Sequence, residues 1–217
     1  MFAPYARTEV WATTAVGAGA AALTALYAGP LWTVLPIAAA AALLSFYRDP
    51  HRTPPARGDV LIAPADGRIV EVTQIPPTDS SPAMLSITIF LSVTNVHLNR
   101  SPCAGRVRAV DYRPGRFLNA LDPASNRENE SNRITFEPNA PLPGPVSIRQ
   151  IAGLLARRIV CAVRPGDSVA LGQRVGMIKL GSRTELCAVD DGGWVVEVKI
   201  GDTVRGAETI MLSRKAG

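Results

Sequence analysis

Three residues far apart in the sequence are of the types that together activate a hydroxyl group. Asp66 lies in a Pro-Ala-Asp-Gly segment, His97 stands among polar residues, and Ser182 directly follows Gly181. A histidine can deprotonate a serine hydroxyl when a carboxylate fixes the orientation of its ring. A serine can also attack the peptide carbonyl that precedes it, and glycine leaves that carbonyl sterically open. The trio predicts a serine nucleophile, with His97 as base and Asp66 as the orienting group.

A further segment is rich in arginine and suits an anionic ligand. Arg149 and Gln150 lie in an Ile-Arg-Gln-Ile-Ala-Gly run, and Arg100 follows His97 by three residues. A guanidinium group can hold two phosphate oxygens at once. We therefore expect Arg149, Gln150 and Arg100 to bind substrate. Structural interpretations stay open, since charged runs are often solvent-exposed, Asp-Gly and Gly-Ser pairs are common in turns, and a single histidine is often structural.

The cysteines and histidines exclude several kinds of site. Cys103, Cys161 and Cys187 are far apart, with no Cys-x-x-Cys motif and an odd count. We expect no disulfide and no metal site, but small buried side chains in a reducing compartment. His51 and His97 are the two histidines of the chain, so histidine chemistry has little choice of residue.

The composition narrows the class of partner. The 217-residue chain has a net charge of +5, with 47% hydrophobic and 19% charged residues. So much apolar surface excludes a chain that is disordered throughout. Aromatic residues make up only 6%, and no basic tract alternates with them, which argues against nucleic acid as a partner. An anionic lipid surface fits the positive charge better.

Residues 1–48 have the pattern of a membrane-associated helical hairpin. No charged residue occurs from 10 to 47, and a Gly-Pro pair divides this run into two apolar segments. As helices, each would span roughly 25–27 Å, slightly less than a hydrocarbon core about 30 Å thick. Arg7 and Arg48 flank the run, which predicts both ends and the following domain on the cytoplasmic side of the cell membrane. Two full spans and a re-entrant hairpin both stay open, whereas acidic Glu9 disfavours a cleaved signal peptide.

A Pro- and Arg-rich linker at 49–58 leads to a predicted mainly β (α+β) catalytic domain at 59–217. Short β-branched runs separated by Gly, Pro and Asp predict its strands. The predicted strands are Val60–Ala63, Gly67–Val72, Leu85–Leu91, Arg106–Tyr112, Arg133–Phe136, Val146–Ile151, Arg158–Val163, Arg174–Lys179, Glu185–Ala188, Trp194–Ile200 and Glu208–Leu212. Short helices are expected near Thr94–Asn99 and Gln150–Ala156.

An internal repeat indicates how these strands are arranged. The sequence around Gly166-Asp167 is echoed around Gly201-Asp202, and in each copy a strand leads to a Gly-Asp turn, then a valine, then another glycine. This order is typical of the corner of a β-hairpin. Two copies predict interlocked double hairpins that form a flattened barrel-sandwich, as in biotin- and lipoyl-carrying domains.

Four motifs together resemble the phosphatidylserine decarboxylase proenzymes of the short, pyruvoyl-dependent form. They are PADG at 64–67, VHxNRxPxxG at 96–105, IRQIAGxxARRIV at 148–160 and GMIxxGSR at 176–183. The likeness covers Arg57–Leu212, which is most of the chain outside the apolar hairpin. Each motif alone is modest, but their combination and order are specific.

The resemblance implies an enzyme that cuts itself between Gly181 and Ser182. Ser182 would become a covalent pyruvoyl group, which replaces pyridoxal phosphate in the removal of CO2 from phosphatidylserine to give phosphatidylethanolamine. The fragments 1–181 and 182–217 would stay together as a heterodimer that could assemble further. A membrane-embedded lipid substrate would also account for the apolar hairpin.

Two positions depart from the family pattern. Longer members have a second histidine where this chain has Arg100, so His97 could serve both self-cleavage and later proton transfer, or another group could take one of these tasks. Members commonly show Asn-Glu-Arg where this chain has Asn129-Glu130-Ser131, which leaves open the residue that orders this loop or contacts the headgroup.

Three alternative functions fit parts of the sequence. Lys179 lies in a segment faintly like a biotin-acceptor site, so the double hairpin could be a carrier or adaptor module. Asp66, His97 and Ser182 could also cleave external peptides, although Gly181 explains self-cleavage more simply. A pyruvoyl decarboxylase could instead act on another serine-headed lipid, such as one with an ether-linked core.

Overall fold

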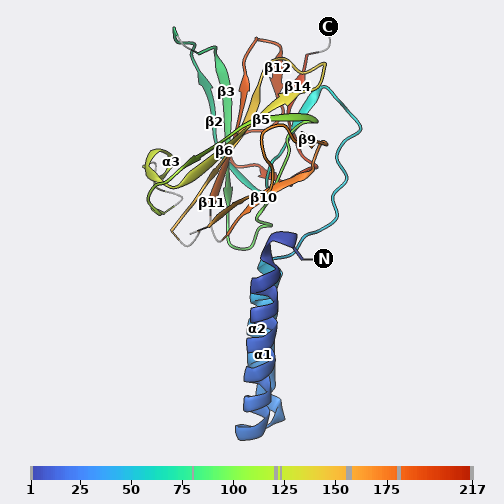
Figure 1. Cartoon of the computed structure of the whole chain (residues 1–217), viewed down its shortest axis with the longest axis vertical. Coiled ribbons are helices and arrows are strands. Elements are labelled where there is room, and N and C mark those ends of the chain that lie inside the picture. Colours follow the sequence, from blue (N-terminus) through green and yellow to red (C-terminus); the bar gives the residue numbers. More distant parts are fainter. Residues whose placement is uncertain are drawn as a thin grey trace. The chain divides into compact units, whose positions relative to one another are not determined.

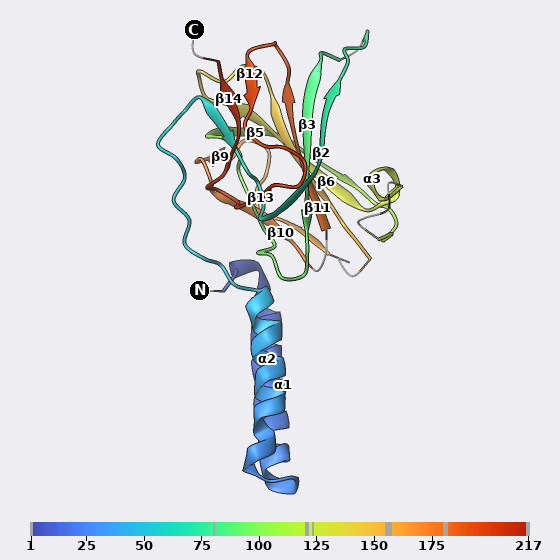
Figure 2. The ribbon, with the colours of Figure 1, turned by 180° about the vertical axis from the view of Figure 1, so that it is seen from behind.

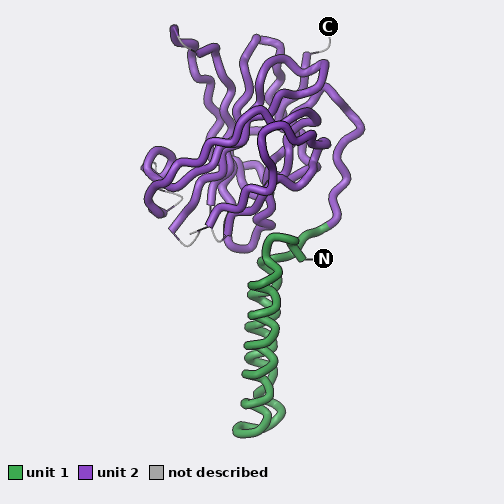
Figure 3. Tube along the Cα trace, viewed as in Figure 1, with its two compact units in different colours: residues 1–50 green, residues 51–217 purple. Residues whose placement is uncertain are grey.

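The chain divides into two compact units, residues 1–50 and 51–217 (Figure 3). The computed structural model describes residues 2–79, 81–119, 122, 124–154, 158–179 and 182–215. The first unit is helical and the second is built from β-strands (Figure 1). The predicted fold class, a mainly β domain with an N-terminal helical hairpin, is confirmed.

The first unit is a pair of apolar helices, each entered through a 3₁₀ turn. The turn η1 (Pro4–Ala6) leads into α1 (Arg7–Tyr27), and η2 (Pro30–Thr33) leads into α2 (Val34–Phe46). Both turns begin with proline, whose fixed φ suits the first helical position and whose missing N–H is not needed there. Gly29 adopts a φ of 96° between the helices, a conformation that glycine adopts without strain.

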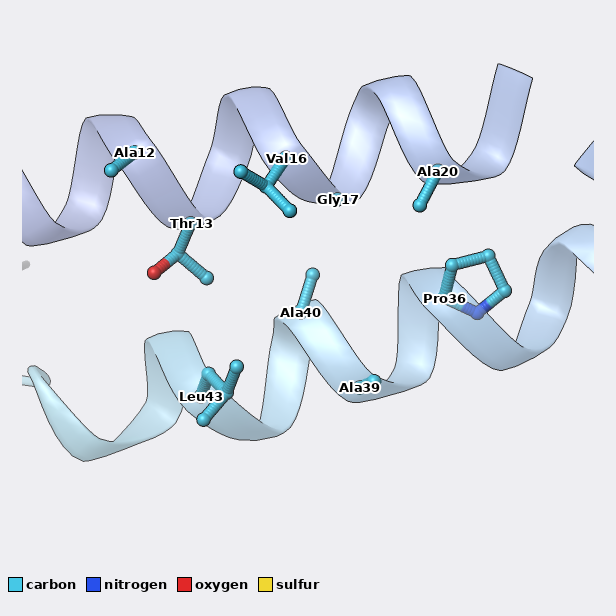
Figure 4. A pocket seen from close by; sticks show the side chains of 9 residues that line it. All are labelled: Ala12, Thr13, Val16, Gly17, Ala20, Pro36, Ala39, Ala40 and Leu43. Carbon is cyan, nitrogen blue, oxygen red and sulfur yellow. The ribbon is translucent and has the colours of Figure 1, made fainter. Parts of the chain in front are cut away.

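The helices α1 and α2 pack side by side through small residues. A Cβ atom on Gly17 would lie only 2.6 Å from the Cβ of Ala40, so the close approach depends on glycine. A groove of about 370 Å³ lies between the helices (Figure 4). Its lining residues are Ala12, Thr13, Val16, Gly17, Ala20, Pro36, Ala39, Ala40 and Leu43.

By length and composition, Pro4–Tyr27 could cross a membrane, which is a weak indication of membrane association. Pro30–Phe46 is a shorter apolar helix.

The second unit is organised around a curled, eight-stranded antiparallel sheet (Figures 1 and 2). Its order is β13-β2-β3-β11-β7-β6-β5-β9, and two smaller sheets have the orders β1-β14-β12 and β4-β10-β8. The strands are β1 (Val60–Ile62), β2 (Gly67–Ile75), β3 (Met84–Leu91), β4 (Leu98–Arg100), β5 (Gly105–Arg113), β6 (Ser131–Pro138), β7 (Val146–Ile151), β8 (Ile159–Cys161), β9 (Ser168–Val169), β10 (Arg174–Ile178), β11 (Ser182–Val189), β12 (Trp194–Val196), β13 (Thr203–Val204) and β14 (Ile210–Arg214). A single short helix, α3 (Ser125–Glu128), is described in this unit.

One apolar row crosses the middle of the large sheet and forms the centre of the core. Ile87, Leu186, Ile148 and Ile134 pair in register across β3, β11, β7 and β6, and all are fully buried. Because side chains alternate along a strand, this row fixes which residues of each strand face the core. Side chains of β1, β12 and β14 pack into the same cluster.

The sheet consists of two similar halves. The hairpin β2–β3 has a register shift after Ile69, and the hairpin β5–β6 has one after Val107, two residues into each first strand. Each hairpin also starts with a glycine pressed against the opposite strand. A Cβ atom on Gly67 or Gly105 would lie 2.2 Å from a carbonyl oxygen of β3 or β6.

The predicted repeat forms the two outer edges of this sheet. Gly166 and Gly201 have φ values of 95° and 98°, which glycine adopts without strain. The two-residue strands that follow, β9 and β13, pair with the starts of β5 and β2 (Figure 2). The two copies are therefore equivalent, as the repeat predicts. Neither turn closes a two-stranded hairpin, because the preceding strands, β8 and β12, belong to the two smaller sheets and do not pair with β9 and β13.

Each predicted strand overlaps an observed one, but both predicted helices are wrong where the structure describes them. Leu98–Arg100 forms β4, which pairs with β10 in place of the helix expected at Thr94–Asn99. Gln150 and Ile151 end β7, paired on both sides by β6 and β11, and residues 155 and 156 lie outside the described part. Pairing with strands distant in sequence overrides local preference in both segments.

We predict that Gly105→Ala destabilises the β domain by at least about 2 kcal/mol, because the carbonyl it would strike belongs to a paired strand that cannot move aside. Urea unfolding of the detergent-solubilised chain, followed by circular dichroism, measures this loss. Gly58→Ala is the control, since its Cβ would meet only Pro141 Cδ, at an ordinary 3.9 Å. Equal stability of the two variants would contradict the interpretation.

Candidate active site

The large sheet brings two of the predicted site residues, Ser182 and Asp66, to one end of the unit. Ser182, the first residue of β11, pairs with Leu91, the last residue of β3. The start of β2 is at the same level, because Arg68 pairs with the residue before Leu91. Asp66 directly precedes β2, so it enters the sheet two strands from Ser182, roughly 10 Å away at the usual strand spacing.

Ser182 is completely buried on the inner face of the sheet. Ser182, Thr184 and Leu186 alternate to the same side of β11, and Leu186 joins the hydrophobic core. The Oγ atom of Ser182 has no hydrogen-bond partner among the described residues. A buried, unpaired hydroxyl costs roughly 1–3 kcal/mol, so a chemical role explains it better than a structural one. Gly181, the other residue of the predicted cleavage site, lies outside the described residues.

His97 is also completely buried, and its ring has a defined orientation. Its Nδ1 atom lies 3.0 Å from the carbonyl oxygen of Asn95. A carbonyl oxygen only accepts, so this bond assigns the proton of the neutral ring to Nδ1 and leaves a lone pair on Nε2. The carbonyl of His97 accepts a 3.1 Å hydrogen bond from Ile178, which ends β10, four residues before Ser182. The backbone carbonyl of Asn95 therefore helps to orient the imidazole.

A buried chain of amide side chains ties the segments of His97 and Ser182 together. Asn99 donates to Thr184 Oγ1 at 2.9 Å, and Gln150 donates to Asn99 Oδ1 at 2.9 Å. His97 directly precedes β4, and Thr184 follows Ser182 by two residues on the same side of β11. The Asn99–Thr184 bond therefore joins the two segments at positions two residues from His97 and from Ser182.

Asp66 lies in an ionic cluster with residues from the linker and the C-terminal region. Its Oδ2 atom is 2.7 Å from Arg52, and its Oδ1 accepts a 2.8 Å hydrogen bond from the backbone N–H of Gly206. Arg52 also contacts Glu208 at 2.9 Å, and only 10% of the Arg52 side chain is exposed. Arg52 thus holds the Asp66 carboxylate in one position at the entrance to β2.

The turn itself does not require the Asp66 carboxylate. The corresponding segment of the other half runs Ser-Pro-Cys-Ala-Gly from Ser101 to Gly105, with Ala104 in the place of Asp66. The two segments exchange backbone hydrogen bonds, from Arg100 N–H to Pro64 and from the Ile62 N–H to Pro102. Because alanine serves in one copy of this turn, the aspartate in the other copy has a role beyond the turn.

The three residues expected to bind substrate do not point to one place. Arg149 and Gln150 are consecutive in β7 and therefore face opposite sides of the sheet. Arg149 pairs with Glu185 at 2.9 Å and donates to Asn126, whereas Gln150 accepts from Asn132 inside the buried amide chain. Arg100 donates to the carbonyl oxygen of Gly172 at 3.1 Å. The described contacts of all three are internal, and substrate binding by them stays a prediction.

Asn129 orders the loop for which the sequence left the ordering residue open. Its side chain accepts from the N–H of Leu118 at 2.8 Å and donates to the carbonyl oxygens of Leu118 and Ala152. These contacts join the segment before α3 to the end of β7. Ser131, at the position of the family arginine, is the first residue of β6 and pairs with Arg113.

Sequence reasoning missed Arg183, which follows Ser182 and points to the opposite face of the sheet. The residue is 9% exposed, and its Nε has no hydrogen-bond partner among the described residues. Burial lowers the pKa of Arg183 from its ordinary value, while the nearby charges of Glu71 and Asp122 act in the opposite direction. Its place in the Gly-Ser-Arg motif was the available signal.

Cys103 and Cys187 are buried thiols that this fold does not activate. Burial raises the pKa of the Cys103 thiol to about 12, and burial with the nearby Glu185 raises that of Cys187 to about 11. All three cysteines are free, and Cys161 is half-buried. Within the described part of the chain, no three His, Cys, Asp or Glu residues form a group suited to a metal ion.

The fold and the site are those of a β-rich enzyme with a hydroxyl and an imidazole buried at one end of its sheet. The family model described as phosphatidylserine decarboxylase matches residues 39–212. A Chlorobium luteolum protein named phosphatidylserine decarboxylase proenzyme is 39% identical over 97% of this chain and 99% of its own length. Proteins of that name from Nitrosomonas europaea and Rhodopirellula baltica are 40% and 42% identical, over 96% and 89% of this chain and 94% and 81% of their own lengths.

The chain belongs to the phosphatidylserine decarboxylase family and is a decarboxylase. Membership supports the decarboxylation of phosphatidylserine as its activity and a proenzyme as its initial form. It gives no support to a carrier module that bears a group on Lys179.

We predict that Arg52→Ala destabilises the second unit by roughly 1–3 kcal/mol, because the largely buried Asp66 carboxylate loses its ionic partner. Urea unfolding of the full chain in detergent gives the free energy. Arg57→Ala is the matched control: Arg57 is in the same linker, but its ion pair with Asp59 is exposed, so its loss should change the stability little. If both variants lose the same stability, the cluster does not anchor the linker.

Proposed function

We propose that the chain cleaves itself between Gly181 and Ser182, and that the mature enzyme decarboxylates phosphatidylserine by means of a pyruvoyl group formed from Ser182. The observation that carries the proposal is the buried hydroxyl of Ser182, which has no hydrogen-bond partner among the described residues. Family membership and the proenzyme name of the relatives support the same chemistry.

In the proposed cleavage, Nε2 of His97 takes the proton of the Ser182 hydroxyl, and the oxygen attacks the carbonyl carbon of Gly181. The peptide C–N bond breaks, an ester bond forms, and the proton passes to the nitrogen. Removal of the α-proton of residue 182 then breaks the Cβ–O bond, so that the chain ending at Gly181 leaves as a carboxylate. Dehydroalanine remains at position 182, and water replaces its nitrogen, which departs as ammonia.

His97 and Asp66 supply the proton transfer for this step. The Asn95 carbonyl fixes the ring so that Nε2 is the basic atom. The Asp66 carboxylate accepts hydrogen bonds from Arg52 and from the N–H of Gly206, and a carboxylate has about four acceptor sites. The carboxylate can therefore stabilise the positive charge that develops on the imidazole, as expected for an orienting acid.

The residues present fit the pyruvoyl group that the family implies. Its precursor, Ser182, is buried beside the hydrophobic core. When formed, a pyruvoyl ketone binds a primary amine and accepts the electrons left by departing CO2. His97 would lie on the inner side with it and could return a proton to the product, while Thr184 and Asn99 keep that side polar.

Strand pairing accounts for a stable pair of fragments. In the proposed mature enzyme, β11 belongs to residues 182–217, while its neighbours β3 and β7 belong to residues 1–181. The ladder hydrogen bonds and the shared core would hold the fragments together as a heterodimer.

The proposed substrate and the apolar helices of the first unit support a membrane location. The apolar α1 is long enough to span a bilayer, and a lipid substrate is reached from the membrane surface. Arg7 and Arg48 flank the helical pair, which favours the cytoplasmic side for the catalytic domain.

We predict that Ser182→Ala remains one uncut chain, because it lacks both the nucleophile and the pyruvoyl precursor. Denaturing gel electrophoresis of purified protein measures the cut fraction. Ser86→Ala removes another buried serine hydroxyl, on the neighbouring β3, and should still be cut. A cut Ser182→Ala chain would refute the mechanism.

We predict that the cut enzyme releases CO2 from phosphatidylserine without added pyridoxal phosphate or metal. Borohydride in the presence of substrate should attach the lipid amine to the 182–217 fragment, which mass spectrometry detects. CO2 release with no such attachment would exclude the pyruvoyl assignment. Comparing diacyl with ether-linked phosphatidylserine in the same assay identifies the preferred lipid core.

A further inference from the structure

A polar pocket lies on the outer face of the large sheet, next to the start of β11. It has a volume of about 380 Å³ and is bounded by β2, β11 and α3. Its lining residues are Val70, Glu71, Asn126, Arg127 and Arg183. No step of the proposed self-cleavage uses this pocket.

Arg183 is the buried member of the pocket. A guanidinium keeps its charge in proteins, and burial of an incompletely paired charged group is costly. Yet Nε of Arg183 is buried without a hydrogen-bond partner among the described residues, and the residue as a whole is only 9% exposed. A ligand oxygen bound in the pocket would satisfy this donor.

The lining of the pocket has a net charge of +1, which suits an anion. Arg183 and Arg127 supply two positive charges, and Glu71 is the acidic residue among those that line it. Asp122, the other carboxylate that acts on Arg183, accepts a 2.9 Å hydrogen bond from the N–H of Ala124 just before α3. Arg149 beside Asn126 is already neutralised by Glu185.

We propose that this pocket binds the phosphodiester group of the phospholipid substrate, an inference that rests on the proposed function. Arg183 would contact the phosphate from the inside of the pocket, and exposed Arg127 from its mouth. Residues 182 and 183 are consecutive, with Cα atoms about 3.8 Å apart, so phosphate and reacting amine bind at adjoining positions. Since their side chains face opposite sides of the sheet, the headgroup lies across the end of β11.

The phosphate is a better ligand for these arginines than the carboxylate of the same headgroup. The carboxylate leaves as neutral CO2, so a charge-paired arginine would stabilise the ground state and oppose the reaction. The phosphodiester keeps its charge throughout, and a planar guanidinium can bind two of its oxygens.

Binding can be measured apart from catalysis in the full, detergent-solubilised chain carrying Ser182→Ala. Isothermal titration with glycerophosphoserine, the deacylated headgroup, should give a Kd that Arg127→Ala and Arg183→Lys each raise about tenfold or more. Arg106→Ala removes an exposed arginine of β5 that does not line the pocket, so it should leave the Kd within about twofold. Free serine lacks the phosphate, so its Kd should not be higher for the variants than for the parent.

Two results would overturn the proposal. One is an unchanged Kd for glycerophosphoserine in both pocket variants. The other is tight binding of inorganic phosphate that glycerophosphoserine cannot displace, which would assign the pocket to free phosphate instead of the lipid headgroup.

A second measurement separates this proposal from the proposed function. In vesicles of phosphatidylserine and phosphatidylcholine, Arg127→Ala should cut itself normally and raise the KM about tenfold relative to Arg106→Ala. Unchanged KM with normal CO2 release would refute the pocket and leave the function standing. If the parent enzyme binds the headgroup through these arginines but releases no CO2, the proposed function is refuted and the pocket stands.

Discussion

The hydrogen bonds of Asn99 are the constraint on which the site depends. Asn99 donates to Thr184 and accepts from Gln150, and all three are fully buried. Buried amides that lose one partner are costly, so these bonds allow a single placement of β4 against β11 and β7. That placement brings His97 toward the end of the sheet where Ser182 begins β11. Substituting Asn99 would therefore disturb the position of the base as well as the stability of the core.

The duplicated architecture separates what the fold needs from what the chemistry needs. Each half has a glycine at the start of its first strand, a register shift two residues later and a two-residue edge strand. Asp66 has only Ala104 as its counterpart, and Ser182 lies on β11, which meets its counterpart β7 at the seam between the halves. A symmetric scaffold thus carries an asymmetric site. Ser182 and Arg183, consecutive residues at the start of β11, have buried polar atoms on opposite faces that find no hydrogen-bond partner in the described part of the chain. Such sites are expected where function takes precedence over stability.

The sequence alone was enough to predict the parts of the fold that depend on local residue patterns. Strand positions followed from β-branched runs, and the Gly-Asp repeat predicted the two equivalent corners. β4 was missed because three residues carry almost no pattern, and its partner, β10, is more than seventy residues away. The substrate arginines were uncertain for a related reason. Only strand register reveals that Arg149 faces Glu185 and that Arg183 lines a pocket.

The central claim is that the Ser182 hydroxyl cuts the chain and becomes the catalytic group, and intact mass spectrometry of the purified protein tests it most directly. The account predicts two chains, residues 1–181 and 182–217, with the smaller one lighter than its unmodified sequence by the mass of one ammonia molecule. A single chain of full mass that nevertheless releases CO2 from phosphatidylserine would contradict it.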